Sequence, residues 1–218
     1  LYEHALPITE EIGGPEHPDT ARGLSNLAML HVDMGQYAMA LPLLQRALAI
    51  SETTIGPNHL DTAARINNLA SLYHDMGRYA EALPLYQRAL AVTEAAVGPM
   101  HPATAQRLSN LSELYRGMGQ YQTALPLMQR ALAISEQVEG AEHPGTSLHL
   151  NNLALLYTEI GRYADALPLY ERALVIREQR NGPAHPLTGI VLNNLAGLHR
   201  DTGEYQNCLL YTSPSPRD

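Results

Sequence analysis

The chain repeats itself every 42 residues over nearly its whole length. One glycine opens each copy, at Gly14, Gly56, Gly98, Gly140 and Gly182. The residues that follow repeat with it, as the segments GPEHPDTARGLSNLA from position 14 and GPNHLDTAARINNLA from position 56 show. Tandem copies of this length restrict the chain to a solenoid or a similar array, in which each copy packs against its neighbours.

The copies also set the predicted domain boundaries. Residues 1–13 match the end of a copy, four complete repeats occupy 14–55, 56–97, 98–139 and 140–181, and an incomplete fifth occupies 182–207. Residues 208–218 depart from the pattern, and their back-translation resembles the transposase adapter used in sequencing libraries. We therefore expect the natural fragment to be residues 1–207, with the true N-terminus missing, and 208–218 to be adapter read-through.

Each repeat is predicted to form two antiparallel α-helices. In the second repeat, two apolar stripes at helical spacing lie on either side of Gly77. The first stripe contains Ile66, Leu69, Ala70, Tyr73 and Met76, and the second contains Tyr79, Ala82, Leu83, Tyr86, Ala89, Leu90 and Val92. The small residues Ala70, Ala82 and Ala89 are expected where the two helix axes approach closely.

The ends of the helices carry their own signals. Gly77 is predicted to end the first helix in a left-handed conformation. Asp61 or Thr62 is predicted to cap the N-terminus of that helix. A proline lies inside each complete second stripe, so we expect a late helix start or a mild bend at Pro42, Pro84, Pro126 and Pro168.

These residues resemble the tetratricopeptide repeat signature. The resemblance is carried by Leu69, Ala70, Tyr73, Gly77, Tyr79, Ala82, Tyr86, Ala89 and Leu90. The 42-residue form, with GPxHPxT and NNLA, resembles the repeats of kinesin light chains and of bacterial multidomain proteins. The resemblance implies an all-α fold, a right-handed superhelical solenoid of antiparallel helix pairs, with the first helix of each pair lining a concave surface.

Asparagine recurs in the middle of all five first helices. One series is Asn26, Asn68, Asn110, Asn152 and Asn194, and Asn67, Asn151 and Asn193 precede three of its members. Asparagine disfavours a helix interior because its side chain competes for the backbone, so the recurrence needs a reason. The resemblance implies that these amides hold the main chain of an extended peptide, since an amide both donates and accepts. The alternative is that they satisfy polar groups of the adjacent repeat.

Neighbouring first-helix positions vary between repeats, as a surface that sets specificity would. Three of them are arginines that could bind acidic groups of a partner in bidentate fashion: Arg22, Arg116 and Arg200. Leu148, Leu155 and Ile190 suggest an apolar pocket toward the C-terminal half. The chain has no lysine, which argues against the carboxylate clamp of chaperone-binding relatives.

Composition and motifs exclude several classes of function. Acidic residues outnumber basic residues 22 to 14, for a net charge of −8, so nucleic acid and anionic membranes are not expected partners. The linker histidines stand one repeat apart, too far for a shared metal ion, so a capping or packing role is expected for His17, His59, His101, His143 and His185. Phosphate-binding loops and nucleophile motifs do not occur in the sequence, and we expect neither a cofactor nor catalysis.

These features predict a protein- or peptide-binding scaffold, not an enzyme, whose groove holds an extended segment through the asparagine series. The alternative is a sensor or regulatory region of a larger bacterial signalling NTPase or caspase-like protease, with the catalytic domain outside this fragment. A third interpretation is self-association through apolar helix faces at the uncapped ends. We expect a cytoplasmic location and, from the arginine-only basic complement, a bacterial source.

Overall fold

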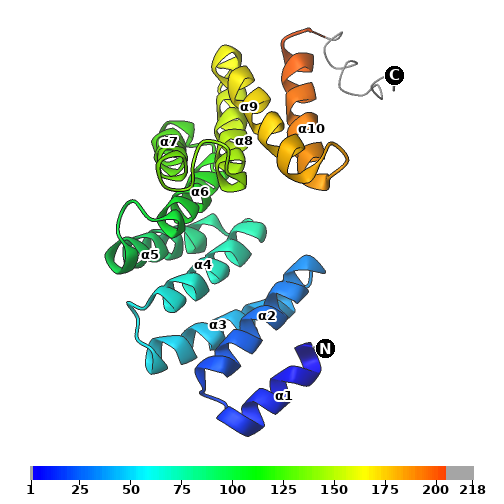
Figure 1. Ribbon diagram of the computed structural model, residues 1–218. Coiled ribbons are helices and arrows are strands. Elements are labelled where there is room, and N and C mark those ends of the chain that lie inside the picture. Colours follow the sequence, from blue (N-terminus) through cyan, green and yellow to red (C-terminus); the bar gives the residue numbers. More distant parts are fainter. Residues whose placement is uncertain (1, 205–218) are drawn as a thin grey trace. The chain divides into compact units, whose positions relative to one another are not determined.

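The computed structural model describes residues 2–204, with side chains from residue 7 onward, so the predicted tail at 208–218 lies outside the described residues. The described chain consists of ten α-helices and no strand, which confirms the predicted all-α class (Figure 1). After α1 (Tyr2–Gly13), the helices follow in pairs, one pair per repeat. They are α2 (Pro18–Asp33) and α3 (Tyr37–Thr54), α4 (Leu60–Asp75) and α5 (Tyr79–Val97), α6 (Pro102–Gly117) and α7 (Tyr121–Val138), α8 (Pro144–Glu159) and α9 (Tyr163–Asn181), and finally α10 (Pro186–Asp201).

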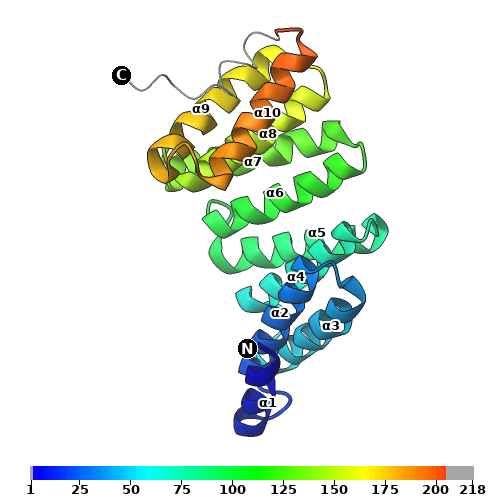
Figure 2. The same cartoon turned by 90° about the vertical axis from the view of Figure 1, so that its right-hand side faces the viewer.

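The chain divides into two compact units, Leu1–Leu114 (unit 1) and Tyr115–Asp218 (unit 2), and the division falls inside α6. In unit 1, α2 packs against α1, α3 and α4, and α4 packs against α3 and α5. In unit 2, α8 packs against α7, α9 and α10. Helices α8, α9 and α10 lie beside one another in Figure 2. In both units a first helix therefore contacts the first helix of the next repeat.

The core of unit 1 runs without interruption from one repeat to the next. A single cluster of buried side chains joins α2, α3, α4 and α5, and it contains Ala28, Ala40, Leu44, Leu48, Ile66, Leu69, Leu72 and Ala89. The alanines predicted at close helix approaches, Ala70, Ala82 and Ala89, are completely buried. Because the cluster spans two repeats, neither helix pair could bury its apolar face alone.

The GPxHPxT segment builds the linker before each first helix. In the second repeat, Gly56 takes a φ of +99°, and the Thr62 hydroxyl donates to its carbonyl oxygen at 2.7 Å. The Nδ1 atom of His59 accepts from the backbone N–H of Asp61 at 3.1 Å. The N-cap is therefore His59, and the prediction of an Asp61 or Thr62 cap is wrong, because Thr62 turns its hydroxyl back to the linker.

The same cap forms in all five first helices. Four other linker histidines bond in the same way: His17, His101, His143 and His185. The Nδ1 atom of each accepts from the backbone N–H of the residue two positions later in the chain, at 3.1 to 3.2 Å. This arrangement confirms the capping role predicted for the linker histidines. In each of these caps Nδ1 is the acceptor atom.

We expect His59→Ala to lower the free energy of unfolding by about 1 kcal/mol, because the first turn of α4 then loses its cap. His59→Asn should restore most of this loss, since asparagine presents an acceptor to the same N–H groups. Urea denaturation followed by circular dichroism measures both changes. Equal losses for the two variants would show that the imidazole acts by packing rather than by hydrogen bonding.

The second helices begin before their prolines, so the predicted late start is wrong. Helix α5 begins at Tyr79, five residues before Pro84, and α3, α7 and α9 start at the same distance from theirs. Proline has no N–H, so the carbonyl of Ala80 cannot accept the usual helical bond. Both Ala80 and Pro84 are exposed, and water can hydrogen-bond this carbonyl instead.

Candidate binding surface on the first helices

In unit 1 the asparagine series borders a pocket between α2 and α4. The pocket has a volume of about 410 Å³, and Asn26, Asn68 and Ser25 are among the residues that line it. The side chains of Asn26 and Asn68 form no hydrogen bond with any described residue. Ser25 instead donates to Ala21 O within its own helix, at 3.0 Å. Two amides therefore keep both their donors and their acceptors available to a ligand.

Charged side chains border the same pocket. Arg22 pairs with Asp19 at 2.9 Å, and Arg65 donates through Nη1 to the carbonyl oxygen of Asp61 at 3.0 Å. Burial lowers the pKa of Arg65, while Asp61 opposes this effect and Arg22 adds to it. The Nε atom of Arg65 is buried without a hydrogen-bond partner in the described structure.

Other recurring asparagines of the first helices hydrogen-bond to each other across repeats. Asn67 is only 6% exposed, and its Oδ1 accepts from Asn110 Nδ2 at 2.8 Å. Asn110 in turn accepts from Gln106 Nε2 at 2.9 Å. These amides satisfy groups of the adjacent repeat, which is the alternative that the sequence left open. The two neighbours Asn67 and Asn68 therefore have different surroundings.

Unit 2 contains the same amide bridge. Asn151 is 7% exposed, and its Oδ1 accepts from Asn194 Nδ2 at 3.0 Å. Its own Nδ2 donates to Asn152 Oδ1 at 3.3 Å. Asn193 is exposed and, within residues 2–204, makes no side-chain hydrogen bond. In unit 2 the available groups are thus Asn193, the carbonyl oxygen of Asn194 and the amide nitrogen of Asn152.

The bridges follow an alternation between odd and even members of the four complete repeats, which the 42-residue period alone does not reveal. Three positions of the repeat alternate in this way. Successive repeats carry Ser25, Asn67, Ser109 and Asn151 at the first position, Gln36, Arg78, Gln120 and Arg162 at the second, and Leu44, Tyr86, Met128 and Tyr170 at the third. In the even repeats, Arg78 stacks on Tyr73 and Arg162 on Tyr157, at 4.6 and 4.5 Å from the ring centres. Aligning repeats two apart, rather than one, would have revealed this signal.

Each of the three predicted groove arginines has an acidic neighbour. In unit 1, Arg22 pairs with Asp19, as described above. In unit 2, Arg116 lies 2.6 Å from Glu159, and Arg200 lies 3.1 Å from Asp201. An acidic ligand would have to compete with these carboxylates for the guanidinium groups.

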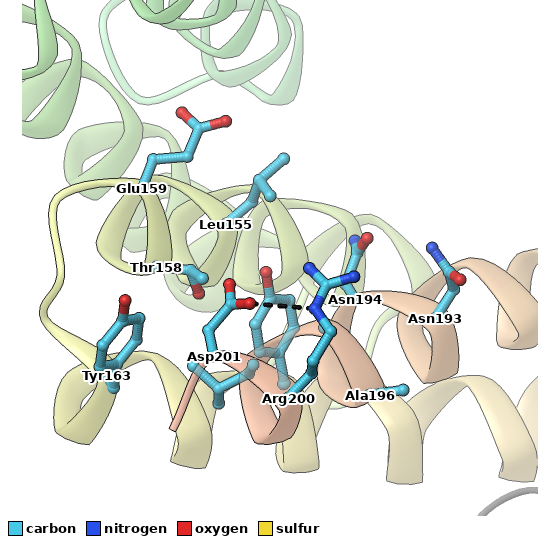
Figure 3. A pocket seen from close by; sticks show the side chains of 12 residues that line it. Leu155, Thr158, Glu159, Tyr163, Asn193, Asn194, Ala196, Arg200 and Asp201 are labelled. Carbon is cyan, nitrogen blue, oxygen red and sulfur yellow. Dashed lines mark hydrogen bonds and ion pairs between the residues drawn. The ribbon is translucent and has the colours of Figure 1, made fainter. Parts of the chain in front are cut away.

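A larger pocket lies in unit 2 between α8, α9 and α10 (Figure 3). Its volume is about 880 Å³, and the side chains of Leu155 and Thr158 on α8 face Arg200 and Asp201 on α10. Of the residues suggested for an apolar pocket, Leu155 lines it, whereas Leu148 and Ile190 are exposed elsewhere.

Tyr170 lines the same pocket from α9. Its side chain is completely buried. Burial raises the pKa of Tyr170 to about 12, and a hydrogen bond to the Thr158 side chain opposes this rise to a smaller extent. The phenol is therefore neutral at physiological pH.

Two further properties concern membranes and metals. None of the helices within residues 2–204 is both long and apolar enough to cross a bilayer. The His, Cys, Asp and Glu side chains of the described chain form no group of three that could hold a metal ion. The surface of the first helices therefore offers amides, hydroxyls, arginines and carboxylates as its binding groups.

Solved structures share this architecture. The nearly identical TPR-like repeats named for a kinesin light chain of Podosopora anserina are 26% identical, with a TM-score of 0.74 over 90% of this chain and 93% of that one. BtubC (BKLC) from P. vanneervenii is 21% identical, with a TM-score of 0.78 over 100% and 91%. Aspartyl phosphate phosphatase F from Bacillus subtilis is 14% identical, with a TM-score of 0.71 over 97% and 62%. The last two likenesses show the fold alone.

The sequence also matches a family model directly. No protein with a curated description matches the chain. The tetratricopeptide repeat model, however, matches residues 1–53, 21–95, 61–137, 103–179 and 145–207 in overlapping windows. These matches cover both helices of every complete repeat and agree with the resemblance inferred from the motif. The chain belongs to the tetratricopeptide repeat family.

Proposed function

We propose that the chain is a scaffold whose first helices bind an extended segment of a partner protein through unpaired asparagine amides. Tetratricopeptide repeats generally serve as scaffolds for protein–protein interaction and are generally not catalytic. The observation that carries the proposal is the pair Asn26 and Asn68, whose amides border one pocket without a partner in the described chain. Each amide can donate to a main-chain carbonyl and accept from a main-chain N–H, whatever the side chains of the partner.

The contrast with the amide bridges supports this assignment. Asn67 and Asn151 are buried and hydrogen-bonded to the next repeat, so their recurrence follows from stability. Asn26 and Asn68 contribute no such bond and still occupy the middle of a helix, where asparagine is disfavoured. We therefore assign backbone recognition in unit 1 to Asn26 and Asn68.

The test begins with a peptide selected from a random display library on the full chain. Its affinity should fall at least about tenfold in Asn26→Ala/Asn68→Ala, because two hydrogen bonds of about 1 kcal/mol each are lost. Asn58→Ala is the matched control, since Asn58 is an exposed linker amide outside the pocket. Fluorescence anisotropy measures the affinities, and urea denaturation confirms that stability is unchanged. Equal affinity for the double variant and the control would contradict the proposal.

A further inference from the structure

We infer that His149 makes unit 2 sensitive to acid: when its imidazole takes up a proton, the packing of α8 loosens, while unit 1 keeps its structure. This property concerns the stability of unit 2 and does not depend on the proposed ligand. It follows from the place of His149 in the core, from the charges around it, and from the residues that occupy the same position in unit 1.

His149 is a buried histidine on a helix that is packed on several sides. It is only 4% exposed, and α8 packs against α7, α9 and α10. Its Nδ1 atom is buried and has no hydrogen-bond partner among the described residues. Because the ring lies against protein rather than water, the charge of a protonated imidazole would be poorly solvated. The neutral imidazole is therefore the form that fits this position.

One carboxylate acts on the imidazole, and it comes from the end of α7. Glu139 lies against Gly145, one helical turn before His149, because a Cβ atom added at Gly145 would meet its Oε2 at 2.8 Å. The same Oε2 accepts from the Ser135 hydroxyl at 2.7 Å, and Oε1 lies 3.3 Å from His143 Nδ1. Both oxygens of this carboxylate therefore already have partners.

Within the described chain, the other helices that pack on α8 add no free carboxylate. Arg177 on α9 donates through Nη2 to Pro144 O at 3.1 Å, which places a positive charge beside the start of α8. The acidic residues of α9 are all exposed: Asp165, Glu171 and Glu178. On α10, His199 and Arg200 pair with acidic residues that follow them. A positive charge on His149 would therefore gain no counter-charge from α9 or α10.

The balance of these effects opposes protonation in the folded state. Burial lowers the pKa of His149, and Glu139 opposes this shift to a smaller extent. In the unfolded chain the imidazole is exposed and takes up a proton near the ordinary pKa of about 6.5. Above this pH both states hold the neutral ring, and the stability is complete. As the pH falls below it, the unfolded state binds a proton that the folded state does not, so stability decreases until the pKa of the folded form is reached.

Unit 1 has no imidazole at this position of the repeat. The corresponding residues are Gly23, Arg65 and Arg107 in unit 1 and Val191 on α10. Glycine has no side chain to titrate, and arginine keeps its charge throughout this pH range. The loss of packing is therefore expected around α8. This helix carries Asn151, so its bridge to Asn194 should open with it.

The experiment measures amide hydrogen exchange of the full chain at about pH 7.5 and about pH 5. The protection factor divides the intrinsic rate by the measured rate, so the direct effect of pH on the exchange reaction cancels. Leu153 on α8 and Leu69 on α4 are the paired reporters, since they occupy the same repeat position and are 4% and 5% exposed. We expect the protection of Leu153 to fall by at least about tenfold, because the ratio of closed to open forms changes about tenfold for each pH unit between the two pKa values of His149. The protection of Leu69 should change by less than about threefold.

Two substitutions remove the group that titrates. His149→Val introduces the residue found at the same position of α10, where Val191 is buried, and His149→Gln keeps a polar side chain. In both variants the protection of Leu153 should no longer respond to acid. His59→Asn is the matched control, since it removes an exposed imidazole of unit 1 and should keep the full acid response at Leu153.

A titration of the histidine ring signals by nuclear magnetic resonance gives a second readout that needs no variant to fold. The imidazole of His149 should titrate at a lower pH than a histidine in a short peptide. An imidazole that titrates at or above the peptide value would overturn the inference. So would an equal acid loss at Leu153 in the wild-type chain and in His149→Val, or a loss at Leu69 as large as that at Leu153.

Discussion

Ala89→Leu is expected to lower the free energy of unfolding by about 3 kcal/mol, the largest effect of any substitution considered for unit 1. Ala89 is completely buried and belongs to the cluster that joins α2, α3, α4 and α5. Leucine adds three carbon atoms where no space is available, so side chains must leave their preferred rotamers or the helices must separate. Because the cluster spans two repeats, both helix pairs should lose stability together.

Ala91→Leu is the matched control for this prediction. Ala91 lies on the same helix, two residues further along, but it is exposed. Leucine and alanine are both strong helix formers, so the free energy of unfolding should change by less than about 0.5 kcal/mol. Urea denaturation of the three proteins under identical conditions gives the comparison. A similar loss for both variants would mean that α5 does not pack through its alanine stripe.

The sequence predicted the helices and the core because both follow from periodicity. Apolar residues at helical spacing, interrupted by Gly77 and Gly98, determine where each helix of the second repeat lies and which face it buries. The buried alanines followed from the same argument, since only a small side chain fits where two helix axes approach closely. Each of these features depends on the spacing along one helix, which the sequence contains in full.

The sequence did not determine which polar atom uses which partner. His59 precedes α4 and Thr62 lies in its first turn, and both side chains carry an acceptor atom. Only the structure shows that the Thr62 hydroxyl donates to the Gly56 carbonyl, whereas His59 caps the helix. Asn67 and Asn68 differ by about 100° around the same helix, and both positions recur with the repeat. Which of them meets the next repeat depends on how two first helices are rotated against each other, and a single period contains no such information.

Asn67→Ala is expected to lower the free energy of unfolding by about 2 kcal/mol, whereas Asn68→Ala should change it by less than about 0.5 kcal/mol. Loss of the Asn67 carbonyl leaves the Nδ2 of Asn110 without its acceptor at a part-buried position between two repeats. Asn68 makes no hydrogen bond with the described chain, so its removal breaks none. The two variants delete the same atoms from adjacent residues of one helix, and urea denaturation compares them directly.

A double-mutant cycle separates the bridge from the other effects of the Asn67 substitution. In Asn67→Ala/Asn110→Ala both partners are absent, so no amide is left unpaired by the loss of the other. The double variant should therefore be more stable than the sum of the two single losses predicts, by about 1 kcal/mol. Strict additivity would mean that the 2.8 Å contact contributes nothing to the junction between the repeats. The recurrence of asparagine at this buried position would then not follow from the bridge to Asn110.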